Sequence, residues 1–277
     1  MSIETPATIS ATAQLGQRFI IRFCLESDAT FGRGDGVIGL IDREVEHDAD
    51  GLPFLRGRTL KGLLNEECAN LLYALEQIAG YEGAVTQRWR NSAKRLFGAP
   101  GSDVTGNAGL RFGDAQLPAT IRNTVRYELR ERALPQSTER LQPTDILNSL
   151  TAIRRQTALD EMGVPITGSL RSMRVILRQT QFEADIVYTL RSQDNNLPAT
   201  EQPKIEQPKT EQLAEWQADD LALLSTVICA WRRAGAGRNR GRGKLKATLH
   251  NAQGDNITAT SLAHFETSLS IQKEGQP

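Results

Sequence analysis

Cysteine and histidine are scarce in this chain, with three of each among 277 residues. The cysteines are Cys24, Cys68 and Cys229, and the histidines are His47, His250 and His264. The cysteines lie far apart in apolar surroundings, which indicates reduced thiols instead of a disulfide framework. No CxxC or HxxxH spacing joins any of these residues, so the pattern gives no support for a zinc site.

Long apolar runs and an export signal are also lacking. The longest apolar runs fall far short of the roughly 20 residues that cross a membrane. The first dozen residues, MSIETPATISAT, have neither the basic start nor the apolar stretch of a secretory signal. We therefore expect a cytoplasmic protein with no membrane partner. A hydrophobic content of 39% with 24% charged residues is ordinary for a globular protein.

The chain has no net charge, because 33 basic and 33 acidic residues cancel. The overall charge is therefore no reason to expect nucleic acid as a partner. The distribution is uneven, however: residues 232–246 hold seven Lys and Arg and no acidic residue, while acidic residues collect at 44–50 and 201–220. The basic stretch is a candidate site for a polyanion.

Hydrophobic periodicity predicts three helices. Leucines at three- and four-residue steps from Leu60 to Leu75, continued by Ile78, predict an amphipathic helix with Thr59 as its N-cap. A second helix is predicted over residues 86–97. A third is predicted from Leu213 to Trp231, with its apolar residues on one face.

Strands are predicted on both sides of these helices. Residues 17–25, QRFIIRFCL, are typical of a central strand, and residues 109–118 of a strand that ends at Pro118. Another strand, KLKATLH, follows the last helix. Two extended segments, near 150–156 and 174–190, flank a loop with the sequence MGVPITGSL and predict a hairpin or projecting arm.

Two segments have no function that the residues reveal. Residues 193–212 contain the repeat EQPKI and EQPKT, and their evenly spaced prolines predict a flexible, solvated spacer. The tail after His250 is expected to form a short helix or to stay loose.

The stretch AGAGRNRGRGKLK, residues 234–246, is not a nucleotide-binding loop of a known pattern. A P-loop needs GxxxxGK[ST] after a strand, whereas this stretch follows a helix and Leu245 follows Lys244. The glycine spacing also fails the dinucleotide fingerprint. What remains is an extended loop whose alternate arginines, Arg238, Arg240 and Arg242, would face one side and grip successive phosphates. The alternative is a flexible, solvated loop.

The stretch GLPFLRGRTLKG, residues 51–62, offers a second anion site. Free amides at a helix N-terminus, with Arg56, Arg58 and Lys61 around them, favour a phosphate. The alternative is an ordinary capped helix start.

The order of these features resembles the RAMP superfamily from about Phe19 to Leu249. More narrowly, it resembles the repeated backbone subunits of type III CRISPR effector complexes. The resemblance implies an α+β fold, with a modified RRM-like or ferredoxin-like antiparallel sheet, helices and an inserted β-hairpin thumb. On this basis residues 1–277 form one domain, with a thumb-like arm at 119–180, the flexible insertion at 193–212 and a C-terminal extension at 251–277.

The resemblance also implies the partners: a CRISPR guide RNA, a target RNA and the other subunits of a type III complex. The arm would wedge between bases and open the guide–target duplex. The residues expected to bind RNA come from the helix start, the arm and the glycine-rich stretch. They are Arg56, Arg58, Thr59, Lys61, Gly62, Arg154, Arg155, Gly235, Gly237, Arg238, Arg240, Gly241, Arg242, Gly243 and Lys244.

By the same resemblance, an aspartate in the loop before GLP cuts the target RNA, and Asp42 matches it. An exposed aspartate, with a pKa near 3.9, is a poor general base at neutral pH. Asp42 is therefore expected to hold Mg²⁺ or to orient the attacking 2′-hydroxyl, with Arg43 stabilising the developing charge. This loop departs from the family pattern in length, Arg56 and Arg58 replace the usual proline and serine, and Asp35, Asp48 and Asp50 compete for the role.

Two alternatives remain. One is a structural RNA-binding subunit without chemistry. The other is a stand-alone, metal-independent endonuclease that processes CRISPR RNA, for which His47 is the nearest histidine.

Overall fold

The computed structural model describes residues 16–34, 41–98, 108–130, 141–189 and 210–270. The first half of this part contains β1 (Gln17–Leu25), α1 (Gly57–Ala79), α2 (Ala84–Phe97), β2 (Leu110–Phe112) and α3 (Ala119–Arg130). The second half contains α4 (Pro143–Leu150), β3 (Thr151–Gln156), β4 (Arg171–Ile176), β5 (Gln181–Tyr188), α5 (Thr210–Ala230), β6 (Leu245–Asn251) and α6 (Thr258–Ser270). The α+β fold is as predicted.

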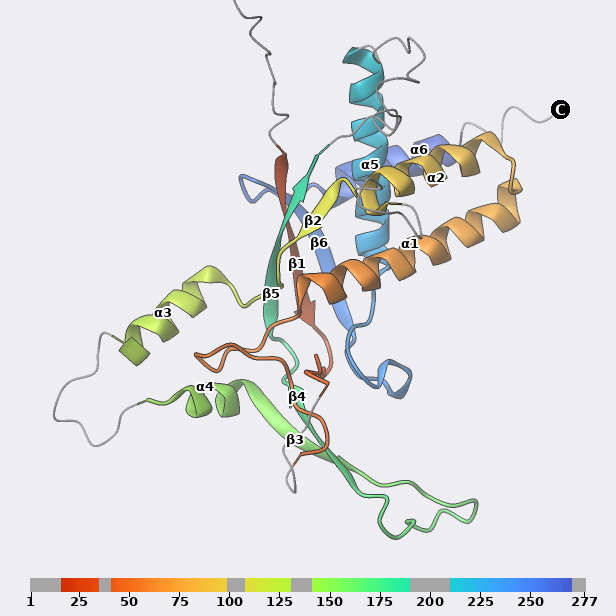
Figure 1. Cartoon of the computed structure of the whole chain (residues 1–277). Helices are drawn as coiled ribbons and strands as arrows, with labels where there is room; N and C mark the ends of the chain where they lie inside the picture. The colour runs from red at the N-terminus through yellow and green to blue at the C-terminus, as the bar shows by residue number, and fades with distance from the viewer. Residues whose placement is uncertain (1–15, 35–40, 99–107, 131–140, 190–209, 271–277) are drawn as a thin grey trace, which may run out of the picture.

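The main sheet has the strand order β2-β5-β1-β6, and every pairing in it is antiparallel. β1 is central, as its sequence predicts. Its alternate residues Phe19, Ile21, Phe23 and Leu25 are buried, because successive side chains of a strand point to opposite faces. Helices α1, α2, α5 and α6 lie on one side of the sheet (Figure 1).

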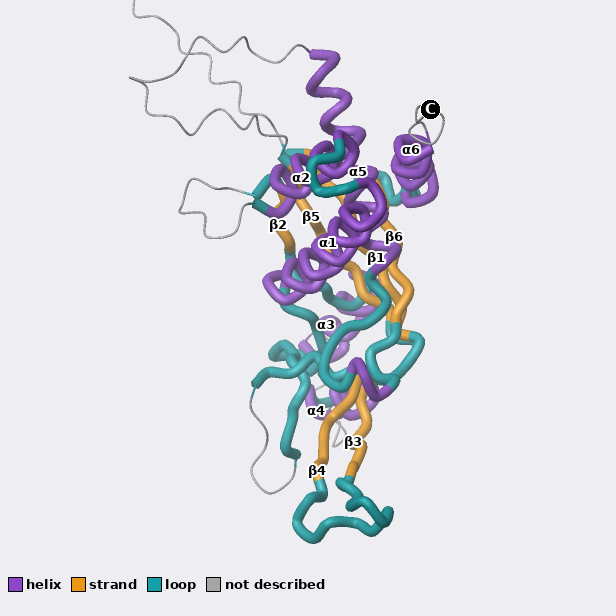
Figure 2. Tube along the Cα trace, turned by 90° about the vertical axis from the view of Figure 1, so that its right-hand side faces the viewer, coloured by secondary structure: helices purple, strands orange, loops and turns teal. Residues whose placement is uncertain are grey.

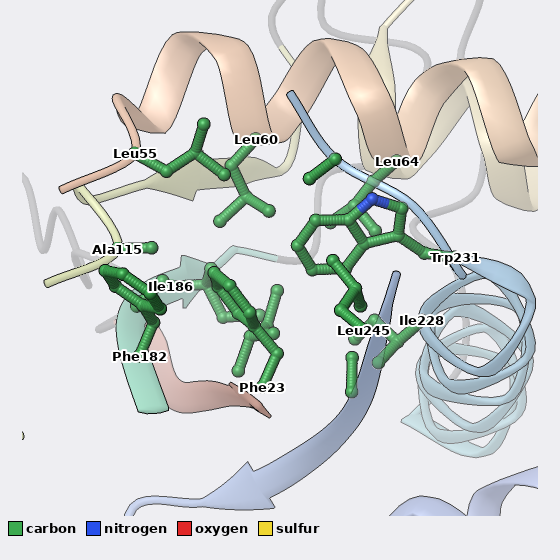
Figure 3. Packing of buried hydrophobic residues seen from close by; sticks show 14 of the residues in the cluster. Phe23, Leu55, Leu60, Leu64, Ala115, Phe182, Ile186, Ile228, Trp231 and Leu245 are labelled. Carbon is green, nitrogen blue, oxygen red and sulfur yellow. The ribbon is translucent and has the colours of Figure 1, made fainter. Parts of the chain in front are cut away.

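An aromatic cluster joins the sheet to the helices. The ring of Phe23 stacks on Phe182 with centroids 5.1 Å apart and meets the edge of Trp231 at 5.0 Å. Leu60 and Leu64 of α1 close the cluster from above (Figure 3). Burial of this cluster fixes the ends of β1 and α5, from which loops run to the site described below.

Helix α1 confirms the predicted periodicity but begins earlier than expected. Its N-cap is Arg56 and not Thr59, because the Gly57 amide donates to Asp114 Oδ1 at 2.7 Å and helical geometry starts there. Thr59 therefore lies inside the first turn. Ile78, predicted on the buried face, is 85% exposed, since the far end of α1 extends beyond the sheet (Figure 1).

β3 and β4 form a separate two-stranded hairpin that projects away from the main sheet (Figures 1 and 2). The predicted continuous segment 174–190 is wrong. β4 ends at Ile176, the chain turns over residues 177–180, and β5 enters the main sheet beside β1. The turn is held by a hydrogen bond of 2.6 Å from the Gln179 amide to the Leu25 carbonyl.

Other predictions differ at the ends of elements. β2 is shorter than the predicted strand at 109–118, because its regular pairing with β5 is interrupted after Phe112, where Asp114 caps α1, before Gln116 pairs again with Glu183. The region 119–180 holds α3 and α4 as well as the hairpin. Residues 210–212 of the predicted spacer belong to α5, and the rest of the repeat lies outside the described residues. The tail forms helix α6. Within the described ranges, every helix is too short or too polar to span a bilayer.

Candidate nucleic-acid interface

A cavity of about 450 Å³ lies where three distant segments meet. The loop before α1 contributes Asp42 and Arg43, the tip-side end of β4 contributes Arg171 and Ser172, and the glycine-rich loop (residues 235–243) contributes Arg240, Arg242 and their neighbours. We call this the front cavity. It brings the predicted catalytic residues together with part of the predicted phosphate-binding loop.

Asp42 is fixed to the hairpin by both its backbone and its side chain. The Asp42 amide donates to the Ser172 carbonyl at 2.9 Å, and the Ser172 amide and hydroxyl donate to Asp42 Oδ2 at 2.6 and 3.3 Å. The adjoining Arg43 pairs with Met173 in parallel register. The loop thus runs along β4 as a short extra strand.

The same contacts keep Asp42 ionised. The amide of Ser172 lowers the pKa of the Asp42 carboxyl, burial opposes this, and the hydroxyl of Ser172 and the charge of Arg171 lower it further. An aspartate with a lowered pKa is a poor proton acceptor at neutral pH but a permanent anion. The front cavity therefore suits Asp42 as a ligand or an orienting group.

Arginines dominate the charge of the front cavity. Arg43, Arg171, Arg240 and Arg242 line it, and Asp42 is the single carboxylate among its described lining residues. Guanidinium groups match the geometry of phosphate oxygens, and clustered positive charge raises the local concentration of an anionic ligand. The cavity fits a phosphodiester backbone better than a neutral ligand.

The glycine-rich loop is not extended, contrary to the prediction. Residues Arg238–Arg240 form a single 3₁₀ turn, because Gly237 and Gly241 on either side have left-handed φ values of 76° and 77°. The three arginines therefore do not face one side. Arg238 Nη1 lies 3.1 Å from Glu66 Oε2 on α1, Arg240 lies 3.4 Å from the side-chain oxygen of Gln156 on β3, and Arg242 contacts the sulfur of Met173.

This loop is tied to the end of β1. The Gly243 amide donates to the Asp28 carbonyl at 2.8 Å, and the Ala236 amide donates to the Thr30 carbonyl at 2.9 Å. A Cβ on Gly243 would lie 1.8 Å from the Ala234 carbonyl oxygen, and one on Gly235 would lie 2.5 Å from that of Thr30. These two glycines admit the protein's own backbone, while Gly237 lines the front cavity.

The sequence profile of the RAMP superfamily matches residues 4–246. This chain belongs to the RAMP superfamily. No curated protein sequence matches it.

Solved structures give the same fold. A chain in "Cryo-EM structure of the Type III-B Cmr-beta bound to cognate target RNA" shares 11% identity over 85% of this RAMP chain and 98% of that chain, with a TM-score of 0.51. A chain of the Cmr-beta apo state gives 12% identity, the same coverage and a TM-score of 0.51. A chain of a "Type IV-B CRISPR Complex" shares 16% identity over 85% of this chain and 91% of that chain, with a TM-score of 0.48. At such identities the first two establish a shared fold.

The helix start of this RAMP protein stands apart from the front cavity. Arg56 is paired with Glu46 at 2.6 Å, Arg58, Thr59 and Gly62 are exposed in the first turns of α1, and Lys61 is half-buried. None of them lines the front cavity. The Gly57 amide already has Asp114 as its acceptor, so the predicted helix-terminus anion site is partly occupied by the protein.

The remaining predicted residues of the RAMP chain lie beside the glycine-rich loop. Arg154 of β3 is paired with Asp28 at 2.9 Å, and Lys244 is paired with Glu26 at 2.9 Å. Arg155 is exposed on β3, opposite Ser172. Gly241 lines a neighbouring cavity together with Arg154.

Sequence reasoning missed Gln156, Arg171, Ser172, Met173 and Asn239 as lining residues of the front cavity. Arg171 and Ser172 follow the turn GSL on the returning strand of the hairpin, opposite Gln156 and Arg155. A register drawn from the two flanking strands would have paired Ser172 with the predicted Arg155. The contact with Asp42 is a long-range one that no local pattern signals.

The competing acidic residues have other partners. Asp48 Oδ1 accepts the amides of Asp50 and Leu52 within its own loop, and Asp50 is paired with Arg126 and Arg130 of α3. Asp35 lies outside the described residues. His47 contacts the Asp48 carbonyl and does not line the front cavity. Across the described ranges, no group of three or more His, Cys, Asp or Glu is close enough to hold a metal.

Proposed function

We propose that this protein is a backbone subunit of a type III-like CRISPR effector complex that binds the guide RNA in the cytoplasm. One observation carries the proposal: the glycine-rich loop, the tip-side ends of β3 and β4, and the Asp42 loop converge on one arginine-lined cavity. Membership of the RAMP superfamily supports it, as does a fold shared with chains of a type III-B complex. Other subunits and the target RNA are then its partners.

The chemistry of the front cavity accounts for binding without sequence preference. Arg43, Arg171, Arg240 and Arg242 would contact phosphate oxygens, which are the same at every nucleotide. Specificity for the target would come from base pairing with the guide. The projecting hairpin, with exposed Leu159, Met162 and Leu170 near its tip, would reach the guide–target duplex and separate its bases.

We further propose that the protein cleaves the bound target RNA at Asp42. The 2′-hydroxyl oxygen would attack the adjacent phosphorus, the bond from phosphorus to the 5′-oxygen would break, and a proton lost from the 2′-hydroxyl to water would be balanced by one gained at the 5′-oxygen. Asp42, ionised and fixed by Ser172, would orient the attacking group. Arg43 and Arg171 would stabilise charge on the phosphorane.

Mg²⁺ fits this arrangement as a partner of Asp42. The observed hydrogen bonds to the carboxylate both use Oδ2, and Mg²⁺ in nucleotide-processing sites is commonly held by one or two carboxylates with substrate phosphates. Asp42 would be its protein ligand. Bound there, the ion would polarise the phosphoryl oxygen.

A second function is favoured by the same hydrogen bonds. Because both the amide and the carboxylate of Asp42 are engaged by Ser172, Asp42 also anchors its loop to the hairpin. That role needs no chemistry, so a non-catalytic subunit is the alternative.

Reconstitution of the complex with labelled target RNA and Mg²⁺ separates the two. We expect Asp42→Ala and Asp42→Asn to lower the cleavage rate by about 100-fold or more while RNA binding is retained. Asparagine keeps an oxygen that accepts a hydrogen bond from Ser172. Loss of cleavage in both variants would therefore assign the effect to the negative charge of Asp42. Asp185→Asn, an exposed aspartate on β5, is the control. Unchanged cutting at the same positions in Asp42→Ala would leave the non-catalytic alternative, and wild-type protein without affinity for RNA would refute both.

A further inference from the structure

A second cavity, of about 720 Å³, adjoins the front cavity. It is lined by the end of β1, by Arg154 of β3, by the turn between β4 and β5, and by Gly241 and Arg242. We call it the side cavity. Because Arg242 lines both cavities, one guanidinium group stands at the junction between them.

The side cavity carries an excess of positive charge. Arg154, Arg178 and Arg242 face two carboxylates, Glu26 and Asp28. Both carboxylates are engaged: Glu26 is paired with Lys244, which lowers its pKa, and Asp28 holds the guanidinium of Arg154 through two hydrogen bonds of 3.0 and 2.9 Å. Arg178 and Arg242 form no ion pair with any residue in the described part of the chain.

Arg178 is mounted on a strained and well-fixed turn. Its neighbour Gln179 has a φ of 69°. Among the non-glycine residues that the structure describes, it is the one with a positive φ. The turn is held by the Gln179 amide on Leu25 and by the Arg178 amide on Asp28 Oδ1 at 3.2 Å. Such strain persists only where the surroundings fix it, and it concentrates at binding sites. The exposed guanidinium of Arg178 therefore projects from a rigid support.

We infer that a ribonucleotide strand held in the front cavity continues across Gly241 and Arg242 into the side cavity. There Arg178 binds the next phosphate, together with Arg154, which Asp28 orients. This inference rests on the proposed RNA binding and extends it to residues of the β4–β5 turn, which carry no signal in the sequence. A continuous polyanion gains from cations spaced along its whole path, and each neutralised phosphate adds to the salt dependence of binding.

The test compares Arg178→Ala with Arg240→Ala, one variant for each cavity. Full-length protein, washed free of nucleic acid at high salt, is titrated with labelled oligouridylates of about 4 and about 16 nucleotides, a range that spans common single-strand site sizes. Arg111→Ala is the matched control, an exposed arginine on the edge strand β2. Arg178→Glu serves as a second variant, and thermal unfolding reports whether each variant is folded.

We expect Arg178→Ala to bind the longer oligonucleotide about three- to tenfold more weakly, with a salt slope reduced by about 0.7. The shorter oligonucleotide should lose less affinity, and Arg178→Glu should exceed Arg178→Ala in effect. If Arg240→Ala weakens binding while both Arg178 variants match Arg111→Ala, the side cavity lies off the RNA path and the inference fails alone. If the wild type binds neither oligonucleotide, the proposed function itself fails.

Discussion

At the residue scale, the glycines of the basic stretch serve a purpose that composition does not reveal. Their density predicted close approach to a ligand. In the structure Gly243 and Gly235 instead admit the carbonyls of Ala234 and Thr30, and only then do the arginines reach their positions. Alternation of Arg and Gly could not disclose this, because the loop is also tied to Asp28 and Thr30, which follow β1 and lie more than 200 residues earlier.

Gly243→Ala tests this use of glycine. The substitution places a Cβ 1.8 Å from a backbone oxygen at a φ of 67°, so we expect it to lower the free energy of unfolding by about 2 kcal/mol or more. Gly62→Ala is the control, because a Cβ there meets nothing within 4 Å and the position is helical. It should raise stability by about 0.5–1 kcal/mol. Urea midpoints measure both, and equal stability of the two variants would contradict the close approach.

At the scale of elements, the periodicity of apolar residues predicted β1, α1, α2 and α5 well, because each of them buries one face on the same core. It did not predict α3 and α4, nor the turn that divides β4 from β5. The turn contains Arg178, Gln179 and Thr180 and has no glycine or proline that would predict it. It forms because the end of β1 supplies its hydrogen-bond partners. Local sequence cannot signal a partner so distant.

Helix α3 offers a prediction about pH. Its Arg126 and Arg130 each donate to buried Asp50 at 3.0 Å; burial opposes ionisation of Asp50, but these hydrogen bonds and charges outweigh it and lower its pKa below 3.8. A lowered folded-state pKa gives stability that is present above the unfolded value and is lost as pH falls through the folded one.

Asp50→Asn should therefore cost about 1 kcal/mol near pH 7, a small value because both arginines are partly exposed. The difference from wild type should shrink as the pH falls below the ordinary aspartate range and disappear below the lowered folded-state pKa of Asp50. Urea unfolding across this range measures it, with Asp185→Asn as an exposed control. A constant difference at every pH would show that shape and not charge is responsible.

At the scale of the whole molecule, the chain is one sheet-and-helix core with a hairpin outside it (Figure 1). The family resemblance foresaw this division. It also implied that the helix start with Lys61 and the glycine-rich loop with Arg240 grip one RNA strand, but Arg240 lines the front cavity with Asp42 and the helix start does not. Convergence of distant loops depends on packing, and order along the chain does not determine it.

The hairpin tip should be dispensable for folding. Residues 157–170 bond mainly to one another, for example Thr157 to Ser169, and Met162 is 89% exposed. Replacing them by Asn-Gly, which suits a two-residue turn between Gln156 and Arg171, should change the free energy of unfolding by no more than about 0.5 kcal/mol. Chemical denaturation checks this. A loss well above that figure would mean that the tip supports the core.

The double attachment of Asp42 to Ser172 has a mechanical consequence. The Asp42 amide and carboxylate both bond to Ser172, so the Asp42 side chain is fixed to the hairpin as firmly as one of the hairpin's own residues. Any tilt of the hairpin would therefore move the Asp42 carboxylate with it. Under the proposed function, contact of the duplex with the hairpin tip would therefore change the position of the Asp42 carboxylate beside it.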